Sequence, residues 1–140
     1  MRNSIYLLLV FCITVMLTGC AENADAPLAS GMQAPTAVQT ITASDARVMI
    51  DSEDETIILD VRTRTEFEQA HIEGALLIPV DELEARALEL LPDKDQIILI
   101  YCRSGNRSAN AARMLMNMGY TAVFDFGGIM SWPYGTVSVG

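Results

Sequence analysis

The residues best suited to chemistry lie in one short segment, Tyr101-Cys-Arg-Ser-Gly-Asn-Arg-Ser108. Cys102 follows an apolar run typical of a buried strand, and the glycine-containing loop after it leads into a helical pattern. Such a loop can aim successive backbone N–H groups at one point, and the positive end of the following helix adds to them. The segment therefore predicts an anion-binding cradle with the Cys102 sulfur at its base.

The same surroundings favour an ionised thiol. A free cysteine has a pKa of about 8.5, which a helix N-terminus and nearby arginines lower to roughly 3.5 to 7.5. Arg103 and Arg107 place positive charge here, in a chain whose net charge is −9. We therefore expect Cys102 to be a thiolate nucleophile that needs no histidine base. Loops related to this one occur in cysteine phosphatases, so the segment alone leaves that reaction class open.

Composition excludes several other classes of function. The chain has 140 residues, 51% of them hydrophobic and 19% charged, which is typical of a globular protein. Nine Lys and Arg against eighteen Asp and Glu argue against nucleic-acid binding. Three cysteines and one histidine are too few for a disulfide scaffold or a four-ligand zinc site. We expect neither a metal nor a cofactor.

The N-terminus predicts export. Arg2 precedes an apolar run from Ile5 to Leu17, which is shorter than the about 20 residues that a spanning helix needs. Leu17-Thr-Gly-Cys20 follows and resembles the lipobox of bacterial lipoproteins, in which the cysteine receives the lipid. Residues 1–19 are thus interpreted as a signal peptide and Cys20 as the lipidation site. The expected product is a membrane-anchored lipoprotein, periplasmic in a two-membrane bacterium; an ordinary cleavage site is the alternative.

The mature chain divides into a tether and one folded domain. Residues 20–39 are mostly small, polar or acidic, and they cannot bury enough apolar surface to fold. They are interpreted as the lipidated N-terminus and a flexible tether. Residues 40–140 form the predicted domain, which has the usual size of a single domain.

Strand and helix patterns alternate along this domain. Apolar, β-branched runs predict strands, whereas helical spacing of apolar residues predicts helices, one of them capped by Asp81. The alternation indicates an α/β fold with a mostly parallel central sheet and helices on both faces. The expected helices are 42–51, 64–70, 81–91 and 107–118, and the expected strands are 56–59, 75–78, 96–101 and 121–124.

Four stretches occur in the same order as the motifs of a known family. They are Leu59-Asp-Val-Arg62 with Glu66-Phe67, Ala70-His-Ile-Glu-Gly-Ala75 with Ile78-Pro79, Tyr101-Cys-Arg-Ser-Gly-Asn-Arg-Ser108, and Gly127-Gly-Ile-Met-Ser-Trp132. Together they make residues 41–132 resemble the rhodanese-like domain family of sulfurtransferases. Ala70 and Glu73 depart from the family's usual glycine and proline, and both positions concern a turn rather than the chemistry.

The resemblance implies a reaction and a set of site residues. Sulfane sulfur would pass from a small anionic donor such as thiosulfate to Cys102, and from the resulting persulfide to a thiol or cyanide-like acceptor. Arg107 would bind the anion, and Arg103 would face outward and guide substrates. His71 is expected to be structural. The implied residues are Cys102 as nucleophile, Arg103, Ser104, Gly105, Asn106 and Arg107 as the binding loop, and Asp60 and Arg62 as supporting groups.

Two other functions compete with this interpretation. A phosphatase or arsenate reductase would use a similar loop, although such loops usually have one more residue between the cysteine and the arginine. A binding module would store or deliver sulfane sulfur without turnover, and it would need Cys102 equally. The sequence identifies no protein partner.

Overall fold

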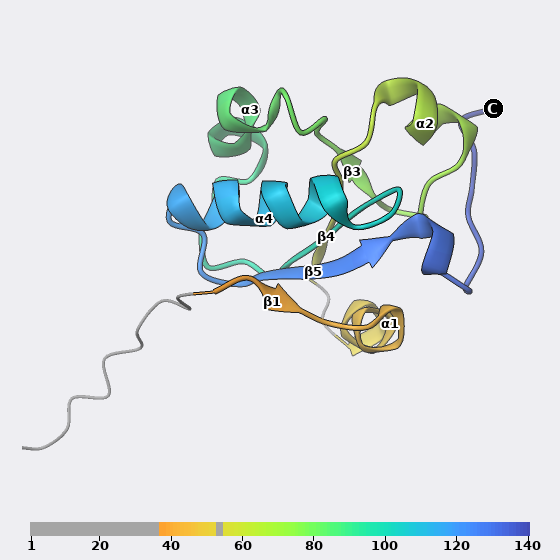
Figure 1. The fold of residues 1–140 in the computed structure, drawn as a ribbon, viewed down its shortest axis with the longest axis horizontal. Coiled ribbons are helices and arrows are strands. Elements are labelled where there is room, and N and C mark those ends of the chain that lie inside the picture. The colour runs from red at the N-terminus through yellow and green to blue at the C-terminus, as the bar shows by residue number, and fades with distance from the viewer. Residues whose placement is uncertain (1–36, 53–54) are drawn as a thin grey trace, which may run out of the picture. The chain divides into compact units, whose positions relative to one another are not determined.

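A parallel sheet forms the centre of the domain (Figure 1). The structure, a computed structural model, describes residues 37–52 and 55–140. Five strands lie in the order β1-β5-β4-β2-β3, and all neighbouring pairs are parallel, which confirms the predicted α/β class. The strands are β1 Gln39–Thr40, β2 Ile57–Asp60, β3 Leu76–Leu77, β4 Ile98–Cys102 and β5 Val123–Gly128. The helices are α1 Ala43–Ser52, α2 Arg64–Gln69, α3 Leu83–Leu90, α4 Asn106–Asn117 and the 3-10 turn η1 Ile129–Ser131.

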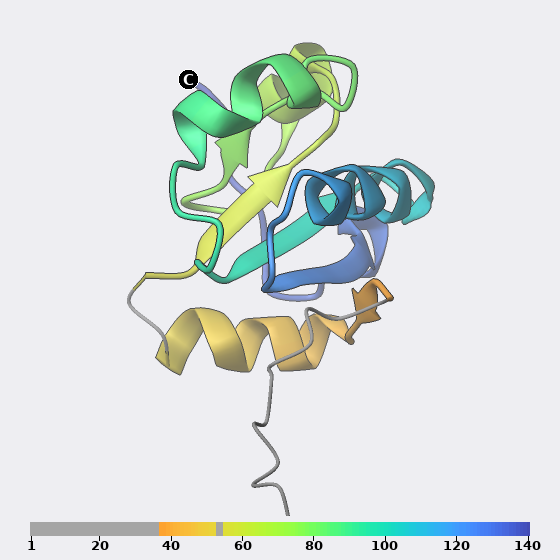
Figure 2. The ribbon, with the colours of Figure 1, turned by 90° about the vertical axis from the view of Figure 1, so that its left-hand side faces the viewer.

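Helices cover both faces of the sheet, with α1 on one side and α3 and α4 on the other (Figure 2). Successive side chains of a strand point to opposite faces, so the buried β4 contributes to two cores. Ile98, Ile100 and Cys102 pack with α3 and α4. Leu99 and Tyr101 pack with α1. Residues of β4 are apolar without alternation because both faces of the strand are buried. Cys102 lies on the face covered by α4.

Three local expectations differ from the structure. The strand expected at 121–124 is β5, which begins at Val123 and continues to Gly128. Strand β1 begins at Gln39, inside the segment interpreted as tether, because its backbone pairs with Phe124 of β5. Asp81 is not the cap of α3: the N-cap is Glu82, whose side chain makes no capping hydrogen bond within the described residues. The Glu82 N–H instead donates to the Pro79 carbonyl at 2.9 Å, in a turn that delays the helix.

The predicted signal peptide, the lipidation site Cys20 and most of the tether lie outside the described residues. They remain predictions. No helix within residues 37–52 and 55–140 is long and apolar enough to cross a bilayer.

Candidate active site

Cys102 is the last residue of β4, a strand paired on both sides by β5 and β2. The residue is only 1% exposed. The chain then turns through a short loop into α4, whose N-cap is Gly105. Gly105 has a φ of +101°, a conformation that residues with a Cβ atom rarely adopt. This turn brings the Gly105 N–H to 3.1 Å from the Cys102 Sγ, to which it donates a hydrogen bond. The turn thus places one backbone donor of the predicted cradle on the sulfur.

Strand β5 supports the loop from the other side. The pairing of β4 with β5 shifts between Ile100 and Cys102, and Cys102 lies opposite Gly128. A Cβ atom at Gly128 would collide with the backbone carbonyl oxygen of Arg103 and would lie 2.7 Å from the Ser104 Cα. A glycine is therefore required here, because any side chain would push the loop away from the sheet.

The pKa of the Cys102 thiol is lowered from its ordinary value. Burial is the largest single influence and raises the pKa, but hydrogen bonds from the backbone and side chain of Ser108 and from the N–H groups of Ser104 and Gly105 together outweigh it. Ser108 is itself fully buried, and its Oγ also lies 3.0 Å from the Gly105 carbonyl oxygen, which is an alternative acceptor for its one hydroxyl hydrogen. The sulfur is thus surrounded by donors that favour the thiolate.

Ser108 was missed among the binding residues. The sequence contains a signal that could have found it, because Ser108 shares the buried stripe of α4 with Ala111, Ala112 and Leu115. A hydroxyl on a buried stripe must find hydrogen-bond partners inside the protein.

The rate of thiol alkylation against pH tests this arrangement. Because the folded site lowers the pKa of Cys102, the thiolate should persist to lower pH, and the midpoint should lie below the about 8.5 of a free cysteine. Ser108→Ala removes a side-chain donor and should raise the midpoint. Ser104→Ala is the matched control, since Ser104 acts through its backbone N–H. An unchanged midpoint in Ser108→Ala would contradict the assigned cause.

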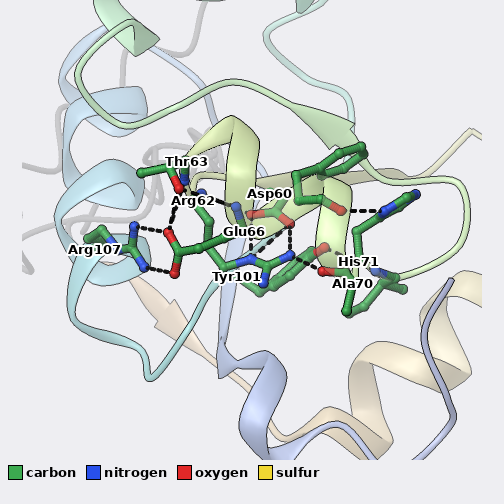
Figure 3. Close-up of polar contacts among 10 residues, drawn as sticks. Asp60, Arg62, Thr63, Glu66, Ala70, His71, Tyr101 and Arg107 are labelled. Atoms are coloured by element: carbon green, nitrogen blue, oxygen red, sulfur yellow. Dashed lines mark hydrogen bonds and ion pairs between the residues drawn. The ribbon is translucent and has the colours of Figure 1, made fainter. Parts of the chain in front are cut away.

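Arg107 is held by a partner that the sequence analysis did not connect to it. Its two terminal nitrogens donate to the two carboxylate oxygens of Glu66 on α2, at 2.7 and 2.8 Å (Figure 3). The hydrogen bond from Arg107 is the main cause that lowers the pKa of Glu66 to about 2. The Glu66 carboxylate, 41 positions away in the chain, therefore competes with any substrate anion for the Arg107 guanidinium.

The other loop residues form the outer rim. Arg103, Ser104 and Asn106 are exposed. The Arg103 carbonyl accepts a 3.4 Å hydrogen bond from the N–H of Met130, which ties the loop to η1. An exposed Arg103 agrees with the expected outward position of its side chain.

Comparison with known proteins places these features in a family. The model of the family described as rhodanese-like domain matches residues 42–133. The chain belongs to the rhodanese-like domain family. It is 38% identical over 71 residues to the thiosulfate sulfurtransferase PspE of Escherichia coli (strain K12), covering 51% of this chain and 68% of that protein.

Two further relatives agree with this assignment. A sulfurtransferase of Allochromatium vinosum is 40% identical over 85 residues, covering 60% of this chain and 77% of that protein. A solved rhodanese with anions from E. coli is similar in fold, with a TM-score of 0.56 and 34% identity, covering 59% of this chain and 98% of that one. Single-domain sulfurtransferases are therefore among the relatives of this rhodanese-like domain.

Asp60 and Arg62 form a buried ion pair in the rhodanese-like domain. The Arg62 Nη2 lies 2.6 Å from the Asp60 Oδ2, and the two side chains are 5% and 0% exposed. The same nitrogen donates to the Ala70 carbonyl at 2.6 Å, which fixes the chain after α2 (Figure 3). Leu59 and Val61 pack on the face that Cys102 occupies. Asp60, the last residue of β2, lies between them in the chain and points to the other face, so this pair occupies a structural position on the face opposite Cys102.

His71 is also structural, as expected. Its Nδ1 donates to the Phe67 carbonyl at 2.8 Å, and its ring stacks on Phe67 with centroids 3.8 Å apart. Its backbone exchanges two 2.8 Å hydrogen bonds with Val137. These contacts attach the segment around residue 137 to the end of α2.

Proposed function

We propose that this rhodanese-like domain transfers sulfane sulfur through a persulfide on Cys102. The observation that supports the proposal most directly is the cluster of N–H and hydroxyl donors around the Cys102 Sγ, which lowers the pKa of the thiol at the end of the central strand. The sulfurtransferases among the relatives support the same reaction class.

The reaction needs one nucleophile and a site for negative charge. The Cys102 thiolate attacks the sulfane sulfur of a donor such as thiosulfate, a new S–S bond forms, and the donor's S–S bond breaks. Sulfite leaves with the electron pair, and Cys102 carries the persulfide. A thiolate or cyanide acceptor then takes the outer sulfur and regenerates the Cys102 thiolate. The loop N–H groups that favour the thiolate also stabilise the persulfide anion and the charge that moves during each exchange.

Intact mass of the purified protein tests the proposal. Thiosulfate should add one sulfur, and cyanide should remove it as thiocyanate. A thiol that labels readily at low pH but gains no sulfur from thiosulfate or from a persulfide donor would overturn the proposal and favour phosphatase-type chemistry. If the protein gains a sulfur but passes it neither to cyanide nor to a thiol, the proposal is wrong and the sulfur-carrier function is favoured.

We also propose that the protein is exported and held at a membrane by lipid on Cys20. The apolar run from Ile5 to Leu17 and the Leu17-Thr-Gly-Cys20 sequence support this location. Cys20→Ala should move the protein from the membrane fraction to the soluble fraction of fractionated cells. Cys12→Ala changes a cysteine inside the predicted signal peptide and should leave the distribution unchanged. Membrane association that persists in Cys20→Ala would indicate that the apolar segment itself is the anchor.

A further inference from the structure

The ion pair between Glu66 and Arg107 lies beside the reactive sulfur and is partly buried. The side chains are 26% and 33% exposed, respectively, and both carboxylate oxygens accept from the guanidinium. Arg107 is in the first turn of α4, close to Cys102, and attraction to Cys102 is one of the smaller causes that raise its pKa, after the hydrogen bond to Glu66. The arginine therefore interacts with two groups that can carry negative charge, the Glu66 carboxylate and the Cys102 thiolate.

Glu66 is fixed in this position by a second set of contacts. It is the third residue of α2 and completes a capping box with Thr63. Its Oε2 accepts from the Thr63 N–H at 3.1 Å and from the Thr63 Oγ1 at 3.0 Å, in addition to the bond from Arg107 (Figure 3). A carboxylate held by a helix cap cannot swing away from Arg107 without losing the cap.

The consequence for a substrate is electrostatic. A free arginine beside Cys102 would attract a doubly charged donor about twice as strongly as a singly charged one, because the interaction is proportional to the product of the charges. The carboxylate of Glu66 cancels most of that advantage. It leaves the neutral loop N–H groups and the exposed Arg103 to bind the anion.

We propose that Glu66 is a specificity-determining residue that makes the site favour singly charged over doubly charged sulfane-sulfur donors. The inference rests on the proposed function and defines its substrate class: donors with one negative charge at the reacting group, such as persulfides and thiosulfonates, are preferred at the expense of thiosulfate. In each case the Cys102 thiolate takes the outer sulfur, and a thiolate or a sulfinate leaves in place of sulfite.

A matched pair of donors tests this preference. Methanethiosulfonate carries a methyl group where thiosulfate carries a charged oxygen, so the two donors differ by one charge at similar size. The measurement is the ratio of kcat/KM for thiosulfate to kcat/KM for methanethiosulfonate, with cyanide as acceptor. Glu66→Gln retains a capping-box residue and removes the charge. It should raise this ratio about three- to tenfold.

Two controls separate charge from structure. Glu68→Gln removes the same charge from an exposed residue of α2 and should leave the ratio unchanged. Glu66→Asp keeps the charge, so the ratio should stay near the wild-type value even if both rates fall. If Glu66→Gln lowers kcat/KM equally for both donors, Glu66 has only a structural role and the proposal is overturned. The proposal is also overturned if Glu68→Gln raises the ratio as much as Glu66→Gln does. If the wild-type protein takes sulfur from neither donor, the proposed function itself fails.

Discussion

Cys102→Ser is expected to abolish sulfur uptake from every donor and to lower the rate of thiocyanate formation at least about a thousandfold. A serine hydroxyl stays protonated at neutral pH and cannot form the S–S bond on which transfer depends. The measurements are the intact mass after incubation with thiosulfate and the initial rate of thiocyanate formation. Retained transfer in this variant would contradict the mechanism.

The same variant should fold normally, which separates loss of chemistry from loss of structure. Cys102 is buried and small, and a serine Oγ can still accept the hydrogen bond from the Gly105 N–H. We expect a change in the free energy of unfolding of about 1 kcal/mol or less. A thermal unfolding curve and the circular dichroism spectrum provide this control.

Asp60→Ala is expected to lower the free energy of unfolding by about 3–5 kcal/mol, because it leaves the buried Arg62 guanidinium without its counter-charge. Asp60 also accepts from the Arg62 backbone N–H at 2.9 Å, so the substitution breaks the turn after β2 as well. Urea unfolding at neutral pH measures the loss through the midpoint and slope of the transition.

Asp51→Ala is the matched control for this prediction. Asp51 pairs with Arg47 on α1 at 2.7 Å, but the two side chains are 55% and 43% exposed. Exposed pairs of this kind contribute about 0.5 kcal/mol or less. Equal losses of stability in Asp51→Ala and Asp60→Ala would refute the argument that burial gives the Asp60 pair its importance.

Local pattern was enough to predict most of the fold and the position of Cys102 between a buried strand and a glycine turn. The buried strand before Cys102, the glycine turn and the helix after it are adjacent in the sequence, so one segment contains the whole signal. The start of α1 was predictable for the same reason, because the Thr42 Oγ1 accepts from the Asp45 N–H only three residues later.

Contacts between distant segments could not be predicted in this way. Strand β1 is two residues long and is defined by backbone pairing with β5, so its side chains carry no strand pattern. The partner of Arg107 is Glu66, which the sequence presents only as part of a motif and a helix start. The close approach of Gly128 to the loop after Cys102 likewise depends on the register between β4 and β5.

The donors around the sulfur are assembled by parts of the chain that meet only in the native state. Gly105 and Ser108 reach Cys102 because the loop is seated against Gly128 of β5, which lies more than twenty positions further along the chain. Before that contact forms, the thiol has the ordinary pKa of about 8.5, and only about 3% of it is ionised at pH 7. A newly made or unfolded chain is therefore expected to react slowly with disulfides and oxidants until it folds. Folding itself therefore makes the Cys102 thiol reactive, because only the folded chain lowers its pKa.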